Sequence, residues 1–263
     1  FPQIDAKVWH ERITNQKVTF DDGSPVYIDT TFQKNRRLKY YREVVNEPKI
    51  PFEERVLFEN EHFLIADKPH FLPIHPAGKY VNETLISRLR AKHNYSDLVA
   101  AHRLDRLTAG LVLCIKKKSS RAAYQNLFME RNISKSYLAV GDIPADSQTQ
   151  WHVINKMAPI KENFRMQIIK GEANTESFIE LIDSKDNLGL FKLKPVTGKK
   201  HQLRVHLCSI GSKIQNDNLY PLPSQTSEDC YDAPMQLLAQ ELSFIDPFTQ
   251  KRMFFTSQLK LNF

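Results

Sequence analysis

One short stretch of the chain has residue types that could do chemistry: the nine residues HRLDRLTAG at positions 102–110. In it Asp105 lies between Arg103 and Arg106, and an apolar run follows at once. Alternate residues of an extended backbone share a face, so Arg103 is expected beside Asp105. A neighbouring positive charge lowers the pKa of a carboxyl group and keeps it ionised, as a nucleophile or a base requires. By itself, the pattern is more typical of an ion-paired acid in a loop.

The common signatures of cofactor and metal sites are absent from the sequence. It contains no G-x-G-x-x-G, no phosphate-binding P-loop and no H-E-x-x-H. The histidine pairs His70/His75 and His201/His206 are five residues apart, a spacing that does not share one helical face. Three widely separated cysteines give neither a zinc spacing nor a disulfide framework. The sequence therefore predicts no metal site and no nucleotide cofactor.

The positive charge of the chain is gathered in runs. Lysine and arginine outnumber acidic residues by 37 to 30, for a net charge of +7. Segment 190–216 holds six basic residues and no acidic one, and segments 34–42 and 116–121 add five and four basic residues. One such run is usually a solvated face. Three together favour a surface for a polyanion such as RNA or DNA.

The elements that position these residues predict two unequal domains, 1–50 and 51–263. In the first, VTF, DDGSP and VYI at 18–28 are typical of a hairpin around an Asp-Gly turn. The basic segment and a proline-containing linker, 46–51, follow. This piece is expected to be a small N-terminal α/β appendage.

The larger piece mixes strands with helices irregularly. Apolar alternation and apolar runs predict strands within 55–68, 110–117, 135–141, 175–183 and 190–196. Helical spacing predicts helices over 82–93, 119–131 and 201–211, capped respectively by Asn82, by serines and by the C-terminal Gly211. Without strict alternation of strand and helix, the pattern favours an α+β fold with a mixed, largely antiparallel sheet and flanking helices.

Five segments in order resemble the motifs of one enzyme family. HRLDRLTAG resembles the H-R-L-D-x-x-T-S-G signature of the RluA-type pseudouridine synthases. DKPHFLPIHPAG, KSYLAVG, ANTESFIEL and TGKKHQLRVHLCSIG resemble further motifs of that family, and the similarity covers about residues 55–255. The pair His70-Phe71 stands in place of a usual Gly-containing pair. Three further positions depart from the motifs, with Asn216 in place of a Gly, Leu238 in place of a common His and Lys199 in place of an Arg. None of them is a catalytic position of the motifs.

The resemblance implies a pseudouridine synthase fold and an isomerase that acts on specific uridines of structured RNA, ribosomal or transfer. It implies that Asp105 is the catalytic residue, that Arg204 pairs with it, and that Tyr137 stacks on the uracil or acts as a base at the sugar. Arg103 is then expected to fill the space of the flipped nucleotide. The residues expected to bind RNA are Arg103, Lys199, Lys200 and His201. The piece 1–50 is similar to the end of a small N-terminal RNA-binding domain that many relatives carry, and this likeness implies a degenerate RNA-binding domain.

The isomerisation adds no atoms and changes no redox state, so it requires no cofactor or metal. Two other functions stay open: an RNA N-glycosidase, which releases free uracil, and a catalytically silent RNA-binding module. The longest apolar run is far too short for a membrane span, and no signal peptide opens the chain, which begins at Phe1. A monomeric cytoplasmic protein is expected.

Overall fold

A computed structural model describes residues 4–40, 44, 46–223 and 229–263 of the chain. The chain forms two compact units, Phe1–Glu47 and Pro48–Phe263, and each is described by itself. Within the described ranges, no helix is both long and apolar enough to cross a membrane.

The small unit contains helix α1 (Ala6–Thr14) and two paired strands, β1 (Val18–Phe20) and β2 (Leu38–Tyr40). The predicted hairpin forms only in part, because the strand partner of β1 is β2 rather than the VYI segment. The Asp-Gly turn does form, and a single bridge joins Thr19 to Pro25. On either side of this bridge the Phe20 N–H donates to the Ser24 carbonyl at 2.8 Å and the Val26 N–H to the Val18 carbonyl at 3.2 Å. Of the basic run 34–42, Tyr41 and Arg42 lie outside the described residues.

The large unit is built on one twisted sheet. Among its described residues eleven strands pair in the order β3-β4-β6-β12-β7-β11-β10-β8-β9, with β13 beside β12 and β5 beside β6. The strands are β3 (Arg55–Glu59), β4 (Phe63–Lys68), β5 (Val99–Ala100), β6 (Ala109–Ile115), β7 (Ile133–Asp142), β8 (Gln150–Pro159), β9 (Met166–Ile169), β10 (Thr175–Lys185), β11 (Leu188–Pro195), β12 (Leu237–Ile245) and β13 (Arg252–Thr256). Only β6 and β12 pair in parallel, so the predicted largely antiparallel α+β fold is confirmed.

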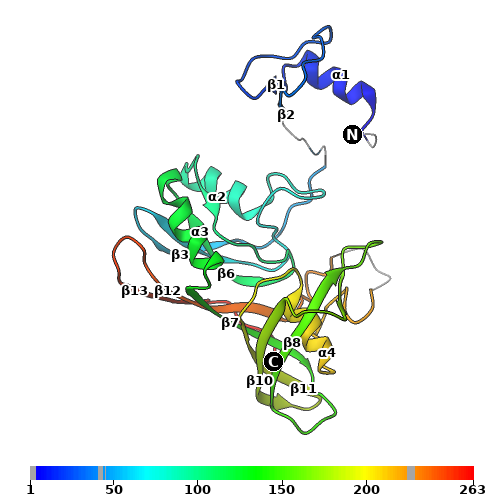
Figure 1. The fold of residues 1–263 in the computed structure, drawn as a ribbon, viewed down its shortest axis with the longest axis vertical. Helices are drawn as coiled ribbons and strands as arrows, with labels where there is room; N and C mark the ends of the chain where they lie inside the picture. The colour runs from blue at the N-terminus through cyan, green and yellow to red at the C-terminus, as the bar shows by residue number, and fades with distance from the viewer. Residues whose placement is uncertain (1–3, 41–43, 45, 224–228) are drawn as a thin grey trace. The chain divides into compact units, whose positions relative to one another are not determined.

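Helices cover both faces of the central strands. Alternate residues of β4 and β6 enter two different cores, which explains why their sequences are continuously apolar. Helices α2 (Leu85–His93) and α4 (Gln202–Ser209) pack into one core, and α3 (Arg121–Met129) packs into the other. Figure 1 shows the sheet extending from β3 and β6 at one end to β8, β10 and β11 at the other.

The helix bounds agree with the predicted segments, but two of the predicted caps are wrong. The α2 cap is Thr84, whose Oγ1 accepts the Ser87 N–H at 3.2 Å, and not Asn82. Ser120 precedes α3 without a side-chain capping bond, because its Oγ lies 3.0 Å from Nδ1 of His62 instead. The expected Gly211 cap is present, with a φ of +87° just beyond α4.

A glycine at the end of HRLDRLTAG lets two strands approach closely. Gly110 has a φ of +112°, and a Cβ there would lie 2.3 Å from the carbonyl oxygen of Ala239 in β12. A side chain at position 110 would therefore push β6 away from its parallel neighbour. The loop that carries Asp105 leads directly into this fixed start of β6.

Candidate active site

Asp105 lies in the loop between β5 and β6, at the wall of a small cleft. Buried Leu104 and Leu107 hold the loop on either side of it, and the Asp105 carbonyl accepts the N–H of Thr108 at 3.1 Å. The Asp105 side chain itself is 23% exposed. The carboxylate is thus fixed by its backbone and still open to the cleft.

A buried arginine from α4 holds this carboxylate. Arg204 is 2% exposed, and its Nη1 donates to Oδ2 of Asp105 at 3.3 Å. Its Nε and Nη2 donate to the two carboxylate oxygens of Asp217 at 2.7 and 2.6 Å. Burial opposes the charge, but hydrogen bonds and charge from Asp217, with Asp105, raise the pKa of Arg204 above its usual value. One guanidinium therefore bridges two acids.

The two arginines that flank Asp105 in the sequence do not pair with it. Arg106 turns away and forms a two-pronged ion pair with Asp229, with both N–O distances at 2.8 Å. Arg103 is exposed and lines the same cleft as Asp105. The ion-paired loop acid suggested by the short motif is therefore not formed locally. Its partner comes from 99 residues further along the chain.

Tyr137 lies on β7, opposite Leu193 of β11, and lines the cleft with Asp105. Burial, and then the charge of Asp105, raise the pKa of the Tyr137 hydroxyl above its usual value. The phenol therefore stays protonated at neutral pH. A neutral ring is suited to stacking on a base, whereas proton abstraction would require a phenolate.

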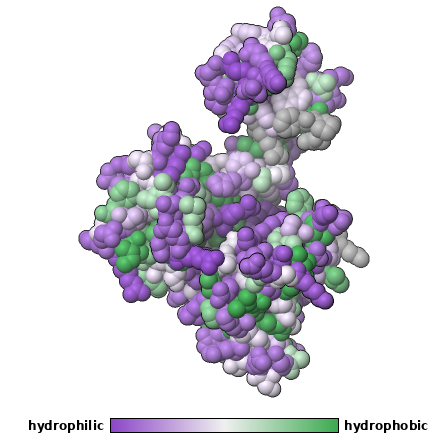
Figure 2. Space-filling model, in the orientation of Figure 1, coloured by the Kyte–Doolittle hydropathy of each residue, from purple (hydrophilic) through white to green (hydrophobic). Residues whose placement is uncertain are grey.

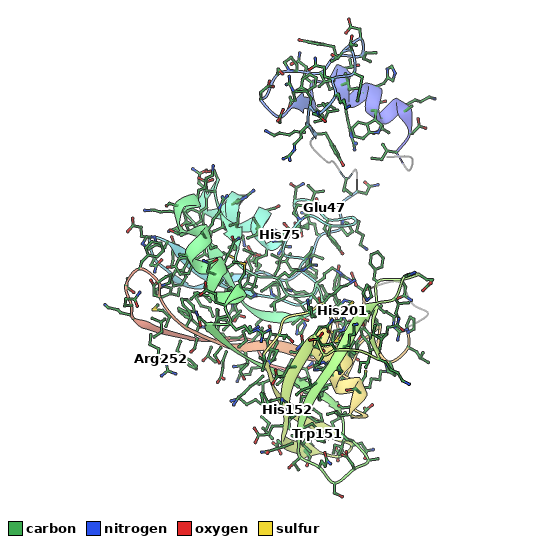
Figure 3. All side chains as sticks on the ribbon, in the orientation of Figure 1. Glu47, His75, Trp151, His152, His201 and Arg252 are labelled. Carbon is green, nitrogen blue, oxygen red and sulfur yellow. The ribbon has the colours of Figure 1, made fainter. Side chains whose placement is uncertain are left out.

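The other residues predicted to bind RNA divide into two groups. His201 and Lys199 line the cleft, whereas Nζ of Lys200 donates to the carbonyl of Phe164 at 2.6 Å, outside it. His201 Nε2 lies 3.8 Å from Oδ2 of Asp105. Figure 3 shows His201 in the middle of the large unit, and in Figure 2 hydrophilic side chains gather on this part of the visible face.

His201 is oriented by a tyrosine. Its Nδ1 lies 2.8 Å from the hydroxyl of Tyr220, which already accepts the N–H of Met166 at 2.7 Å. Burial lowers the pKa of His201 to about 4, so the ring is neutral at pH 7. If the Tyr220 hydroxyl donates to Nδ1, the remaining ring proton is on Nε2 and faces Asp105.

Comparison with known proteins identifies the family to which this chain belongs. The family model described as RNA pseudouridylate synthase matches residues 62–209, more than half of the chain. The chain belongs to the RNA pseudouridylate synthase family. The predicted enzyme class, an isomerase of the RNA pseudouridine synthase type, is thereby confirmed. The matched range includes Asp105, Tyr137 and Arg204 but ends before Asp217.

Individual pseudouridine synthases resemble the chain over most of its length. An uncharacterized RNA pseudouridine synthase of Mycoplasma pneumoniae is 30% identical over 79% of this chain and 67% of its own. The mitochondrial tRNA pseudouridine(32) synthase of Saccharomyces cerevisiae is 30% identical over 63% of this chain, but over only 37% of its own length. The structure of human RNA pseudouridylate synthase domain containing 1 has a TM-score of 0.66 at 20% identity, covering 81% and 86% of the two chains. This likeness shows the fold.

Two residues of this pseudouridine synthase site were not singled out from the sequence. Asp217 is the main partner of Arg204, and Lys68 is a fully buried lysine whose Nζ donates to the carbonyls of Pro69, Leu72 and Arg106 at 2.9–3.2 Å. Burial lowers the pKa of Lys68 to about 7, although the charge of Asp105 and the three carbonyls favour the ammonium form. Both lie in segments that carry or adjoin family motifs. Lys68 follows the apolar run that begins at Phe63, which was the available signal, whereas Asp217 lies in the polar stretch QNDN.

Four histidines, one buried and three partly buried, predict how the stability of the enzyme depends on pH. Burial lowers the pKa to about 4 for His70, His201 and His206 and to about 3 for His102. In the unfolded chain imidazoles bind protons near pH 6.5, so below that pH the unfolded state binds more protons. The free energy of unfolding is therefore highest above about pH 6.5. It should fall toward pH 4, by up to about 1.4 kcal/mol per pH unit for each histidine.

Urea unfolding at several pH values measures this slope. His102 accepts the Leu113 N–H at Nε2, and a glutamine amide oxygen can replace that acceptor. His102→Gln should therefore reduce the slope by one proton. Equal slopes for wild type and His102→Gln would contradict the lowered pKa of His102.

Among the described residues, no three His, Cys, Asp or Glu side chains gather as a metal-binding group.

Proposed function

We propose that the enzyme converts specific uridines of structured RNA to pseudouridine, with Asp105 as the catalytic residue. The observation that carries the proposal is the sharing of Arg204 between two acids. Its two short bonds go to buried Asp217, and only the longer contact of 3.3 Å reaches Asp105. Asp105 is thus held in place without being the guanidinium's main partner, which leaves an oxygen able to react.

The reaction breaks the bond between the anomeric carbon and uracil N1, turns the base, and joins carbon 5 to the sugar. Carbon 5 then loses its hydrogen. A carboxylate at Asp105 can attack the anomeric carbon or remove a proton from the sugar, and both routes use the same position. Tyr137 would stack on the uracil as a neutral phenol. Arg103, exposed at the edge of the cleft, would occupy the place of the flipped nucleotide.

The RNA substrate is transfer or ribosomal RNA in this proposal, and transfer RNA has the more specific support. The yeast relative is named as a tRNA synthase, although the chain covers only 37% of its length. That the enzyme acts as a cytoplasmic monomer, and that the small unit binds RNA, stay predictions of the sequence.

Two measurements test the proposed function. RNA tritiated at uridine carbon 5 should release label in step with pseudouridine, and pseudouridines mapped in total RNA should be lost at specific sites when the gene is deleted. Release of free uracil would show an N-glycosidase instead. Binding of RNA without label release or uracil release, and an unchanged map, would show a silent RNA-binding module.

Salt should weaken RNA binding strongly, and Lys199 should contribute more than Lys200. Several phosphate contacts predict a slope of about −3 or steeper for log affinity against log salt. Lys199 lines the cleft, whereas Lys200 already donates to Phe164. Lys199→Gln should therefore flatten the slope more than Lys200→Gln, and the double variant should still turn over. Filter binding at increasing salt measures this, and a wild-type slope near zero would refute the basic surface.

A further inference from the structure

The basic run at 116–121 is largely neutralised by acids in the fold. Lys116 and Lys117 pair with Glu59 and Glu61, and Arg121 lies 3.4 Å from Asp97. In the small unit Arg36 likewise pairs with Asp22 at 2.7 Å. These pairs engage three of the four basic residues at 116–121, so this run offers a polyanion less free positive charge than its sequence suggests.

Four cations from distant parts of the sequence gather in a groove beside the active-site cleft. The groove has a volume of about 660 Å³ and shares Arg103, Lys135, Tyr137 and Lys199 with the cleft over Asp105. Arg131 adds a fourth positive charge from the end of α3. No Asp or Glu is among the described residues that line the groove.

Within the described parts of the chain, these four cations have no acidic partner. None of them forms an ion pair with any described residue, although Lys135 is only partly exposed. Burial, and then the charge of Arg131, lower the pKa of Lys135. An unpaired, partly buried ammonium is costly, and an anion in the groove would offset that cost. The ligand suited to this groove is therefore negatively charged.

The size of the two cavities shows where RNA can lie. The cleft over Asp105 holds only about 100 Å³, whereas ligand sites usually offer roughly 300–1,000 Å³. The groove of 660 Å³ is within that range, and part of its lining also lines the cleft over Asp105. Its lining includes His102 stacked on Phe128, with ring centroids 4.6 Å apart. It thus combines aromatic surface with free cations, as single-stranded RNA sites do.

We propose that this groove binds the phosphates of the nucleotides on one side of the target uridine, with Arg131 and Lys135 as the contacts. The proposal rests on the proposed function, because the position of the RNA strand is inferred from a target uridine bound at Asp105. It assigns RNA contacts to two residues outside the basic runs. The strand then leaves the active site toward the end of α3.

The test compares two double variants that remove the same charge. Arg131→Gln with Lys135→Gln removes two cations of the groove. Lys116→Gln with Lys117→Gln removes two cations that are paired with glutamates. The probe is total transfer and ribosomal RNA, tritiated at uridine carbon 5 and purified from cells that lack the gene, and its binding is measured by filter binding over a range of salt. Thermal unfolding of each variant checks that it folds.

For the groove variant we expect a salt slope less steep than wild type by about 1.5, since each lost contact to a single strand removes about 0.7. Its affinity near physiological salt should fall about tenfold or more. In the tritium-release assay, the RNA concentration that gives half of the maximal rate should rise by a larger factor than the maximal rate falls. The paired-lysine variant should stay close to wild type. Equal slopes for the groove variant and wild type, or equal losses in both variants, would overturn the proposal.

The assay separates this proposal from the proposed function. If wild type binds the RNA but releases no tritium, the function is wrong, and the difference in slope still tests the groove. If wild type releases tritium and the groove variant binds like wild type, the function stands and the groove is wrong.

Discussion

Asp105→Asn should abolish isomerisation while leaving RNA affinity nearly unchanged. The substitution keeps the size of the side chain and most of its hydrogen bonding to Arg204, but it removes the charge that attack or deprotonation requires. The rate of tritium release in a single turnover should fall by several orders of magnitude, which corresponds to about 5 kcal/mol or more in the barrier. Filter binding of the same RNA should give a dissociation constant close to that of wild type.

A second acid near the catalytic loop supplies the matched control. Asp229 pairs with Arg106 and does not line the cleft over Asp105. Asp229→Asn removes the same charge and should lower the rate far less than Asp105→Asn. Near wild-type tritium release by Asp105→Asn would show that Asp105 is only a loop acid held by Arg204.

Asp217→Asn should reduce both stability and rate, because it removes the main partner of a buried guanidinium. Arg204 and Asp217 are each about 2% exposed at the side chain, and Asp105 alone would then have to balance the charge. Removing one partner of a buried pair typically costs 3–5 kcal/mol, so the free energy of unfolding should fall by about 3 kcal/mol. Arg204 would also move toward Asp105 and bind it more tightly, which should slow the reaction. Urea unfolding and tritium release measure the two effects.

Arg204→Lys tests the same arrangement from the other side. Lysine keeps the charge but loses the planar donors that reach Asp217 and Asp105 together. Its rate should lie between those of wild type and Asp105→Asn. If Asp217→Asn is as stable and as fast as wild type, the bridge between the two acids has no role in the enzyme.

Strong local patterns predicted most of the fold. The continuous apolar run of β6 and the stripe of Leu85, Ile86 and Leu89 on α2 are buried as their spacing indicates. Helix α4 was predicted from the spacing of its residues, but that spacing does not show that residues 202–207 are all buried, including Arg204 and His206. Their partners, such as Asp217 and Thr175, lie elsewhere in the fold.

Strands β8, β12 and β13 and helix α1 were not predicted, and the partner of β1 was wrong. β8 is half exposed and carries polar residues at many positions, so its pattern is weak. β2 lies within a run of basic residues, which lack the apolar alternation by which a strand is predicted. The pairing of β1 depends on which segment can complete the hydrogen-bond ladder. The spacing of residues along the chain does not show which segment that is.

The sequence by itself determined which side chains are available for chemistry: the acid of HRLDRLTAG, the tyrosine of KSYLAVG and the arginine of the α4 segment. The tertiary structure decided which charges are paired. Asp105 is held by Arg204 and not by the arginines beside it, the lysines at 116 and 117 are neutralised, and Arg131 and Lys135 have no acidic partner among the described residues. The physical reason is that charges interact over a few ångströms of space, and only the fold decides which residues come that close.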